Sequence, residues 1–117
     1  MSPAFLFGKD RVAAIGTPGG STIITQVLLG ILDLETGGGP ASWVSVPRFH
    51  HQYLPDVIQY EPEAFDTRLR ESLQAKGHEL KLLGSDYGNM QAIYWDYRTG
   101  EVSAASDPRG IGASAVR

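Results

Sequence analysis

A chain of 117 residues is long enough for one domain, and we expect a single domain over residues 1–117 that buries roughly two thirds of its unfolded surface. The formal net charge is −3 and the basic residues are scattered, so a nucleic-acid-binding face, which needs a basic cluster, is not expected. The absence of cysteine excludes disulfides and thiolate chemistry, and the longest apolar run is too short and too interrupted to span a membrane.

The first part of the chain predicts a hairpin followed by a long helix. Two short apolar runs, residues 4–7 and 11–15, flank a Gly-Lys-Asp turn and are typical of paired strands. Apolar residues then recur at helical spacing over residues 21–34, which predicts a helix buried on most sides. Glycines and a proline at residues 37–40 end this helix, and a short helical turn is expected over residues 41–44.

The second part predicts one further helix and several short strands. Phe65, Leu69 and Leu73 recur every four residues within 63–76, and Gly77 occupies the position at which a glycine commonly ends a helix. The expected strands cover residues 57–60, 79–83, 90–97 and 101–106, with a turn joining the last two. Small side chains in the last strand would let a helix approach closely, which suits an α/β fold with α+β layers.

The glycine turn Gly16-Thr17-Pro18-Gly19-Gly20-Ser21-Thr22 lies between the second expected strand and the long helix. Pro18 favours an extended Thr17, the glycines permit a tight turn, and Ser21 or Thr22 can cap the helix. Such a turn presents bare backbone N–H groups that can hold an anion or stabilise an oxyanion during acyl transfer. Its spacing matches neither a phosphate loop nor a dinucleotide fingerprint. Plain turn chemistry is the alternative interpretation of this motif.

Structural roles are the first interpretation of the remaining basic side chains. His50 and His51 are adjacent and would point to opposite faces of an extended chain, so with few other ligands no metal site is expected. Arg48 and Arg109 lie beside prolines, and each is expected to bridge loop carbonyls or a carboxylate such as that of Asp107. Direct contact of these arginines with a substrate is the alternative.

Acidic and hydroxyl side chains give no evident catalytic pair. Asp56, Glu61 and Glu63 are expected to form a solvated rim around two prolines. The threonines within residues 17–25 are internal and have no activating base nearby in sequence, so none is expected to act as a nucleophile.

Three segments accompany the glycine turn in a fixed order: Met1-Ser2-Pro3, Pro47-Arg48-Phe49-His50-His51-Gln52 and Ala105-Ser106-Asp107-Pro108-Arg109-Gly110. Together, at these separations, they resemble the C-terminal part of the small subunit of γ-glutamyltransferases over nearly the whole chain. Members of that family are N-terminal nucleophile hydrolases, in which a precursor cleaves itself and the new N-terminal Thr attacks a γ-glutamyl amide. The resemblance implies part of an α/β/β/α sandwich.

The same resemblance implies roles for individual residues. Gly19 and Gly20 would be the catalytic glycine pair whose N–H groups form the oxyanion hole. Ser2 would belong to the substrate-binding region, directly after the place where the family has a serine pair that contacts the γ-glutamyl carboxylate. Neither a cofactor nor a metal is implied, and the Thr nucleophile would lie upstream of every residue in this chain.

We therefore expect the chain to be part of an enzyme that transfers a γ-glutamyl group from glutathione-like amides to amino acids, peptides or water. Its expected partners are the remaining small-subunit and large-subunit polypeptides. It is not expected to bind nucleic acid or a membrane. Alone, the chain is expected to be inactive and, because sheet edges and an apolar face would be open, to self-associate. The alternative is a truncated or split non-catalytic chain that acts as a partner or anion-binding domain. The resemblance suggests a periplasmic or secreted location.

Overall fold

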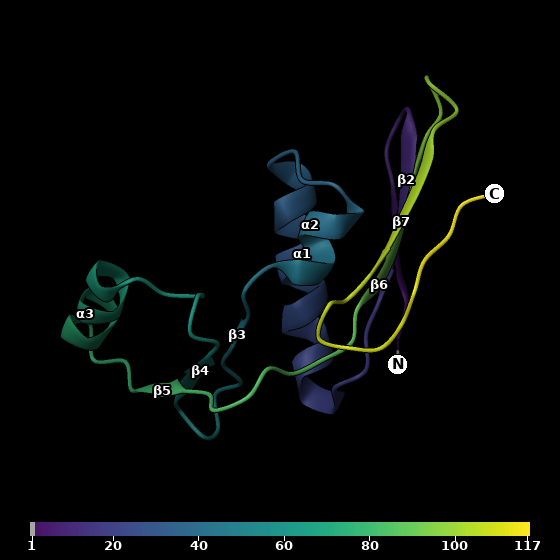
Figure 1. The fold of residues 1–117 in the computed structure, drawn as a ribbon. Helices are drawn as coiled ribbons and strands as arrows, with labels where there is room; N and C mark the ends of the chain where they lie inside the picture. Colours follow the sequence, from purple (N-terminus) through teal and green to yellow (C-terminus); the bar gives the residue numbers. More distant parts are fainter. Residues whose placement is uncertain (1) are drawn as a thin grey trace. The chain divides into compact units, whose positions relative to one another are not determined.

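The structure is a computed structural model that describes residues 2–117. The chain divides into two compact units, one holding the residues up to Val46 together with Tyr87–Arg117 and the other holding Pro47–Asp86. In chain order the elements are β1 (Ala4–Phe7), β2 (Arg11–Gly16), the 3-10 turn η1 (Gly20–Thr22), α1 (Ile23–Glu35), α2 (Pro40–Ser45), β3 (Phe49–His50), β4 (Ile58–Tyr60), α3 (Thr67–Ala75), β5 (Leu80–Leu82), β6 (Gln91–Asp96) and β7 (Val102–Ser106) (Figure 1).

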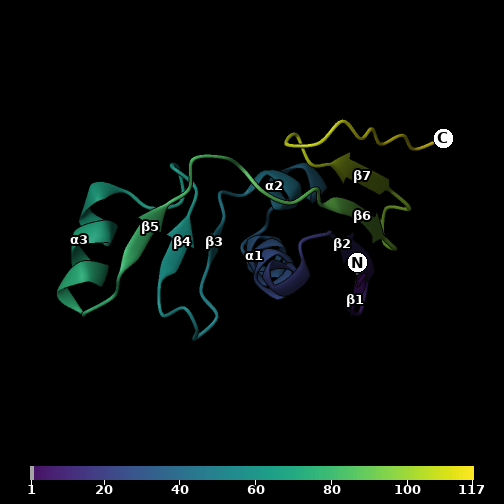
Figure 2. The same ribbon diagram turned by 90° about the horizontal axis from the view of Figure 1, so that it is seen from below.

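The first unit contains an antiparallel sheet in the order β1-β2-β6-β7, which confirms both expected hairpins. The turn of the second hairpin closes because Gly100 adopts φ +72 and Asp96 Oδ1 accepts the N–H of Arg98 at 2.8 Å. A further hydrogen bond from the Arg98 guanidinium, at 3.1 Å, holds the pKa of Asp96 below its ordinary value. Both α1 and α2 lie on the same side of the four strands (Figure 2).

Successive side chains of a strand point to opposite faces of the sheet, so one set of apolar side chains packs against the two helices. Small inward side chains such as Ala92 and Ala105 leave room for Trp43 of α2, which is fully buried. The indole N–H of Trp43 donates to the carbonyl of Gly38 at 2.7 Å, and its ring meets Tyr94 edge-on with centroids 5.8 Å apart. The expected close approach of a helix to the last strand is confirmed, since α2 packs against β6 and β7.

The second unit has a sheet in the order β3-β4-β5, with an antiparallel and a parallel pair, and α3 connects β4 to β5. Its helix begins later than the expected residue 63, because the Asp66 carboxylate caps α3 by accepting the N–H of Leu69 at 2.7 Å. Phe65 consequently precedes the helix and stacks on Tyr60 at a centroid distance of 4.9 Å. Gly77 ends α3 as expected, with φ +91. The short strand β3 was not predicted.

Mixed helices and strands in two sheets confirm the expected layered α+β fold class. Within residues 2–117, no helix is both long and apolar enough to cross a membrane.

The face of the four-stranded sheet that points away from α1 and α2 is apolar and exposed. The strand register aligns Phe7 with Val12 and Val12 with Trp95, and the next row contains Phe5, Ala14 and Ile93. We call this surface the open sheet face; its large exposed side chains are Phe5, Phe7, Ile93, Trp95 and Val102.

Candidate functional site

The glycine turn adopts a backbone that only glycine accommodates well. Gly19 has φ +141 and Gly20 has φ +60, both in the region that L side chains rarely adopt. At Gly19 a Cβ atom would also lie 2.5 Å from Thr22 Oγ1 and 2.7 Å from Gln26 Nε2, whereas at Gly20 it would meet open space. The backbone therefore requires glycine at both positions, and space requires it at Gly19 as well.

The carbonyl groups of the turn are bonded inward while its N–H groups are left available. The Gly19 carbonyl accepts the N–H of Thr22 at 3.2 Å and its hydroxyl at 2.9 Å, and the Gly20 carbonyl accepts the N–H of Ile23. Within residues 2–117, the N–H groups of Gly19 and Gly20 donate no hydrogen bond, and both residues are exposed. They lie where η1 leads into α1, at a helix N-terminus that favours negative charge.

The expected side-chain cap of the long helix was wrong. A 3-10 turn precedes α1, and Thr22 at the N-cap position has helical dihedrals and makes no side-chain cap hydrogen bond. Its hydroxyl is already engaged, because it donates to the Gly19 carbonyl and accepts from Gln26. Ser21 does not cap the helix either.

A buried polar cluster lies directly beneath the turn. Thr17 and Gln26 are both fully buried, and the Thr17 hydroxyl donates to Gln26 Oε1 at 2.8 Å. Gln26 Nε2 donates to Thr22 Oγ1 at 2.9 Å and to the Pro18 carbonyl at 3.2 Å. Sequence reasoning missed Gln26, although a single amide within the otherwise apolar stretch 23–34 is a signal that could have found it.

Asp107 and Arg109 join three segments of the first unit. Asp107 Oδ2 accepts the N–H of Met90 at 2.9 Å, and Oδ1 accepts the backbone N–H of Arg109 at 3.0 Å and its guanidinium at 3.2 Å. The guanidinium also donates to the carbonyls of Val44 and Val46, each at 3.2 Å. The loop after β7 is thereby bonded to the entry of β6 and to the C-terminal end of α2.

Strand register brings several of these residues to one end of the sheet. Ala4 pairs with Ile15, and Gly16 pairs with Gln91, which in turn pairs with Ser106. Ser2 precedes β1 and is exposed, the glycine turn follows β2, and Asp107 follows β7, so all three lie beyond the same end of the strands.

The remaining candidates belong to the second unit. Arg48 has a fully buried side chain, and its N–H donates to Glu61 Oε2 at 2.8 Å while its carbonyl accepts the N–H of Glu61 at 2.8 Å. The expected position of Glu61 in a solvated rim was therefore wrong: the residue is 3% exposed because its carboxylate satisfies a buried backbone donor. Asp56 and Glu63 are exposed, as expected.

The two adjacent histidines bond to separate partners. His50 Nε2 lies 2.9 Å from Gln52 Oε1, and His51 Nε2 lies 2.8 Å from Asp56 Oδ1. Each ring therefore has a hydrogen-bonding partner a few residues further along the chain.

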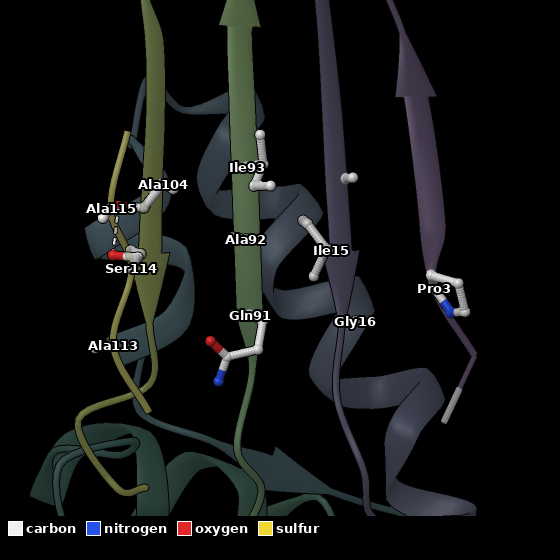
Figure 3. Close-up of a pocket in the computed structure, with 12 residues that line it drawn as sticks. Pro3, Ile15, Gly16, Gln91, Ala92, Ile93, Ala104, Ala113, Ser114 and Ala115 are labelled. Atoms are coloured by element: carbon white, nitrogen blue, oxygen red, sulfur yellow. Dashed lines mark hydrogen bonds between the residues drawn. The ribbon is translucent and has the colours of Figure 1, made fainter. Parts of the chain in front are cut away.

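A pocket of about 460 Å³ lies on the open sheet face (Figure 3). It is lined by Pro3, by small and apolar residues of β2, β6 and β7, and by residues 113–115 of the tail, which run beside β7. Among the residues described, Gln91 and Ser114 supply its polar side chains, and the Ser114 hydroxyl donates to the Ala104 carbonyl at 3.1 Å. The pocket is therefore an apolar hollow without a titratable side chain in its lining.

Comparisons with known proteins agree with the arrangement of these segments. The family model described as Gamma-glutamyltranspeptidase matches residues 1–117. A glutathione hydrolase proenzyme of Pseudomonas aeruginosa is 40% identical over 99% of this chain and 21% of its own length. The glutathione hydrolase proenzyme of Escherichia coli is 36% identical over 95% of this chain and 19% of its own length. The chain thus spans about a fifth of the length of these curated relatives.

A solved structure extends the likeness to the fold. A mutant gamma-glutamyltranspeptidase of Helicobacter pylori superposes with a TM-score of 0.86 at 31% identity, covering 94% of this chain and 61% of that chain. This similarity confirms the expected architecture of the N-terminal nucleophile hydrolase type. From its sequence match and its fold, the chain belongs to the gamma-glutamyltranspeptidase family.

Proposed function

We propose that this chain supplies the oxyanion-stabilising element of a γ-glutamyltransferase, with Gly19 and Gly20 as the donors. The observation that carries this proposal is the pair of adjacent N–H groups that have no acceptor within residues 2–117 and that lie at the start of a helix. During attack on a γ-glutamyl amide the carbonyl oxygen becomes negatively charged. Fixed donors aimed at that oxygen stabilise it, and removing one such donor typically costs about 2.7–4 kcal/mol of transition-state stabilisation.

The proposed reaction is acyl transfer through a threonine supplied by the rest of the enzyme. The threonine oxygen bonds to the γ-carbonyl carbon of a donor such as glutathione, the amide C–N bond breaks, and the departing amine takes a proton. The amine of an amino acid or peptide, or a water molecule, then attacks the ester and releases the threonine. Ser2, at the same end of the sheet as the glycine turn, is the proposed contact of this chain with the γ-glutamyl carboxylate.

The proposed partners are the remaining small-subunit and large-subunit polypeptides. Two observations support this: the chain spans about a fifth of its curated relatives, and the open sheet face exposes Phe5 at 63% and Phe7 at 78%. Exposed apolar surface of this kind marks an interface. Sequencing upstream of the Met1 codon separates this proposal from a non-catalytic partner role. An in-frame segment with an internal threonine at the start of a small subunit supports the enzyme, and a stop codon supports the non-catalytic role.

The donor role is tested by Gly20→Val in the complete, processed enzyme. That enzyme is made from the gene that encodes this segment, or by exchanging the segment into the Pseudomonas aeruginosa relative. A β-branched residue does not tolerate φ +60, so the substitution turns the Gly20 N–H away while its side chain meets open space. We expect kcat for a chromogenic γ-glutamyl anilide to fall by about 10²-fold or more, with KM changed little.

Gly100→Val is the matched control. Gly100 has φ +72, also faces open space, and lies in the β6–β7 turn, so it carries a similar backbone strain without touching the glycine turn. The control is expected to lose comparable thermal stability and to keep kcat. Subunit processing is checked by gel for both variants. If folded, processed Gly20→Val enzyme retained near-normal kcat, the glycines would be turn residues only.

A further inference from the structure

We propose that Gln26 is a positioning residue for the oxyanion donors, acting through the two peptide groups that carry the Gly19 and Gly20 N–H groups. The inference rests on the donor role proposed above and extends it to a residue of α1. Gln26 lies in the first turn of that helix, is fully buried, and its side chain reaches back to the glycine turn.

The first peptide group is held by Gln26 directly. The Pro18 carbonyl and the Gly19 N–H belong to one planar peptide unit, in which a trans geometry points the two groups in opposite directions. Gln26 Nε2 binds the Pro18 carbonyl at 3.2 Å from the buried side. The N–H of Gly19 is thereby directed away from the helix.

The second peptide group is held through Thr22. The Gly19 carbonyl and the Gly20 N–H form the next peptide unit, and this carbonyl accepts the Thr22 hydroxyl at 2.9 Å. The same hydroxyl accepts a hydrogen bond from Gln26 Nε2 at 2.9 Å, so its own proton is directed to Gly19. One buried amide therefore sets the orientation of both donors.

The orientation of the Gln26 amide is itself determined by its partners. A carbonyl can only accept, so the group facing Pro18 must be the NH₂. The oxygen then receives the Thr17 hydroxyl at 2.8 Å, and Thr17 leads directly into the turn from β2. The amide cannot flip without breaking these contacts, which are costly to lose in a buried site.

Gly19 and Gln26 also depend on each other sterically. A Cβ at Gly19 would lie 2.7 Å from Gln26 Nε2, so the amide comes this close only because the residue is glycine. Neighbouring positions of α1 that face the core, including Val27, Ile31 and Leu34, are apolar. An apolar residue at position 26 would fill the space equally well, yet would leave the Thr22 hydroxyl without the Gln26 donor and the Pro18 carbonyl with the Thr17 hydroxyl, at 3.0 Å, in place of the amide.

The experiment uses the complete, processed enzyme with Gln26→Met, Gln26→Glu and the control Gln74→Met. Methionine keeps the length of the side chain and removes its hydrogen bonds, whereas glutamate places a second carboxylate oxygen against the Pro18 carbonyl. Gln74 is an exposed residue of α3, so its change to methionine tests the substitution itself. The measurements are kcat and KM for a γ-glutamyl anilide and the Ki of a γ-boronic acid analogue of glutamate, which forms a tetrahedral adduct.

We expect Gln26→Met to lower kcat by about tenfold or more, less than the loss of a whole donor, and Gln26→Glu to lower it further. KM stays within about twofold of the unmodified enzyme, because the donors act on the charge of the transition state. The Ki of the boronic acid rises in proportion to the fall in kcat/KM. Gln74→Met changes none of these values. A role of Gln26 in stability alone would lower the melting temperature and leave kcat and Ki of the folded fraction unchanged.

Folded Gln26→Met enzyme with unchanged kcat and Ki would overturn the inference. If Gly20→Val still lowered kcat in that case, only the role of Gln26 would fail, and if Gly20→Val also retained kcat, the donor role itself would fail. Should Gln26→Met not fold, Thr22→Val removes the hydroxyl that links Gln26 to the Gly19 carbonyl. This variant is expected to lower kcat and raise Ki in the same proportion, and unchanged values would equally overturn the inference.

Discussion

Replacing Phe7 and Trp95 together by serine should weaken self-association of the isolated 117-residue chain. Both side chains lie on the open sheet face, where the register aligns them in one row through Val12. Phe7 is 78% exposed and Trp95 is 47% exposed, so their rings contribute much of the apolar surface that a second copy can cover. Serine is compatible with an exposed strand, and it removes the apolar surface of the two rings.

The size of the effect follows from the exposed area. An aromatic side chain buries about 150–250 Å², so the exposed fractions correspond to roughly 150 Å² for Phe7 and roughly 120 Å² for Trp95. At about 25 cal/mol per Å², full coverage of either ring stabilises a complex by about 3–4 kcal/mol. Association of two copies covers only part of a face, so we take about a third of the sum for the two rings, about 2 kcal/mol, as the stabilisation that the serine variant loses. This loss corresponds to a Kd for self-association about 30-fold weaker.

The assay is size-exclusion chromatography with light scattering over a dilution series, together with binding of a hydrophobic dye. The matched control is Tyr53→Ser with Leu54→Ser, since these side chains are 78% and 68% exposed in the second unit. We expect the control to associate like the unmodified chain and the Phe7/Trp95 variant to dissociate at higher concentration. Equal association of all three proteins would refute the inference that the isolated chain self-associates through the open sheet face. So would a dilute monomer of the unmodified chain that melts sharply and binds no dye.

Two further predictions concern catalysis and stability. The isolated chain should not turn over a chromogenic γ-glutamyl anilide, because Thr17 is buried and donors alone supply no nucleophile; turnover abolished by Gly20→Val would contradict this and direct attention to the exposed Ser2 and Ser21. In the complete enzyme, Arg109→Ala should lower the free energy of unfolding by about 3–5 kcal/mol, since it removes the guanidinium that pairs with the buried Asp107 carboxylate at 3.2 Å. Arg109→Lys should restore only part of this stability, because an ammonium cannot bridge the Val44 carbonyl, the Val46 carbonyl and the carboxylate at once. A loss below about 1 kcal/mol in urea unfolding would show that the pair is unimportant.

The sequence by itself determined those features that depend on neighbouring residues. Alternation and turn residues located both hairpins of the first unit, and apolar spacing located α1, because each signal is contained in a short window. Gly77 marked the end of α3 because helices commonly end at a residue with left-handed backbone dihedrals, which glycine adopts without strain, and this requirement involves only neighbouring residues. The order of the four motifs was sufficient to identify the family, and the match of the family model over residues 1–117 confirms this identification.

Only the tertiary structure decided how polar groups distant in sequence satisfy one another. Glu61 is buried because the Arg48 N–H, thirteen residues earlier, needs an acceptor, and no local pattern distinguishes it from its exposed neighbours. The place of Gln26 beneath the turn depends on the left-handed backbone of Gly19 and Gly20, which brings the Pro18 carbonyl and the Thr22 hydroxyl to one amide. Strand register, a long-range property, brings Ser2, the glycine turn and Asp107 to the same end of the sheet.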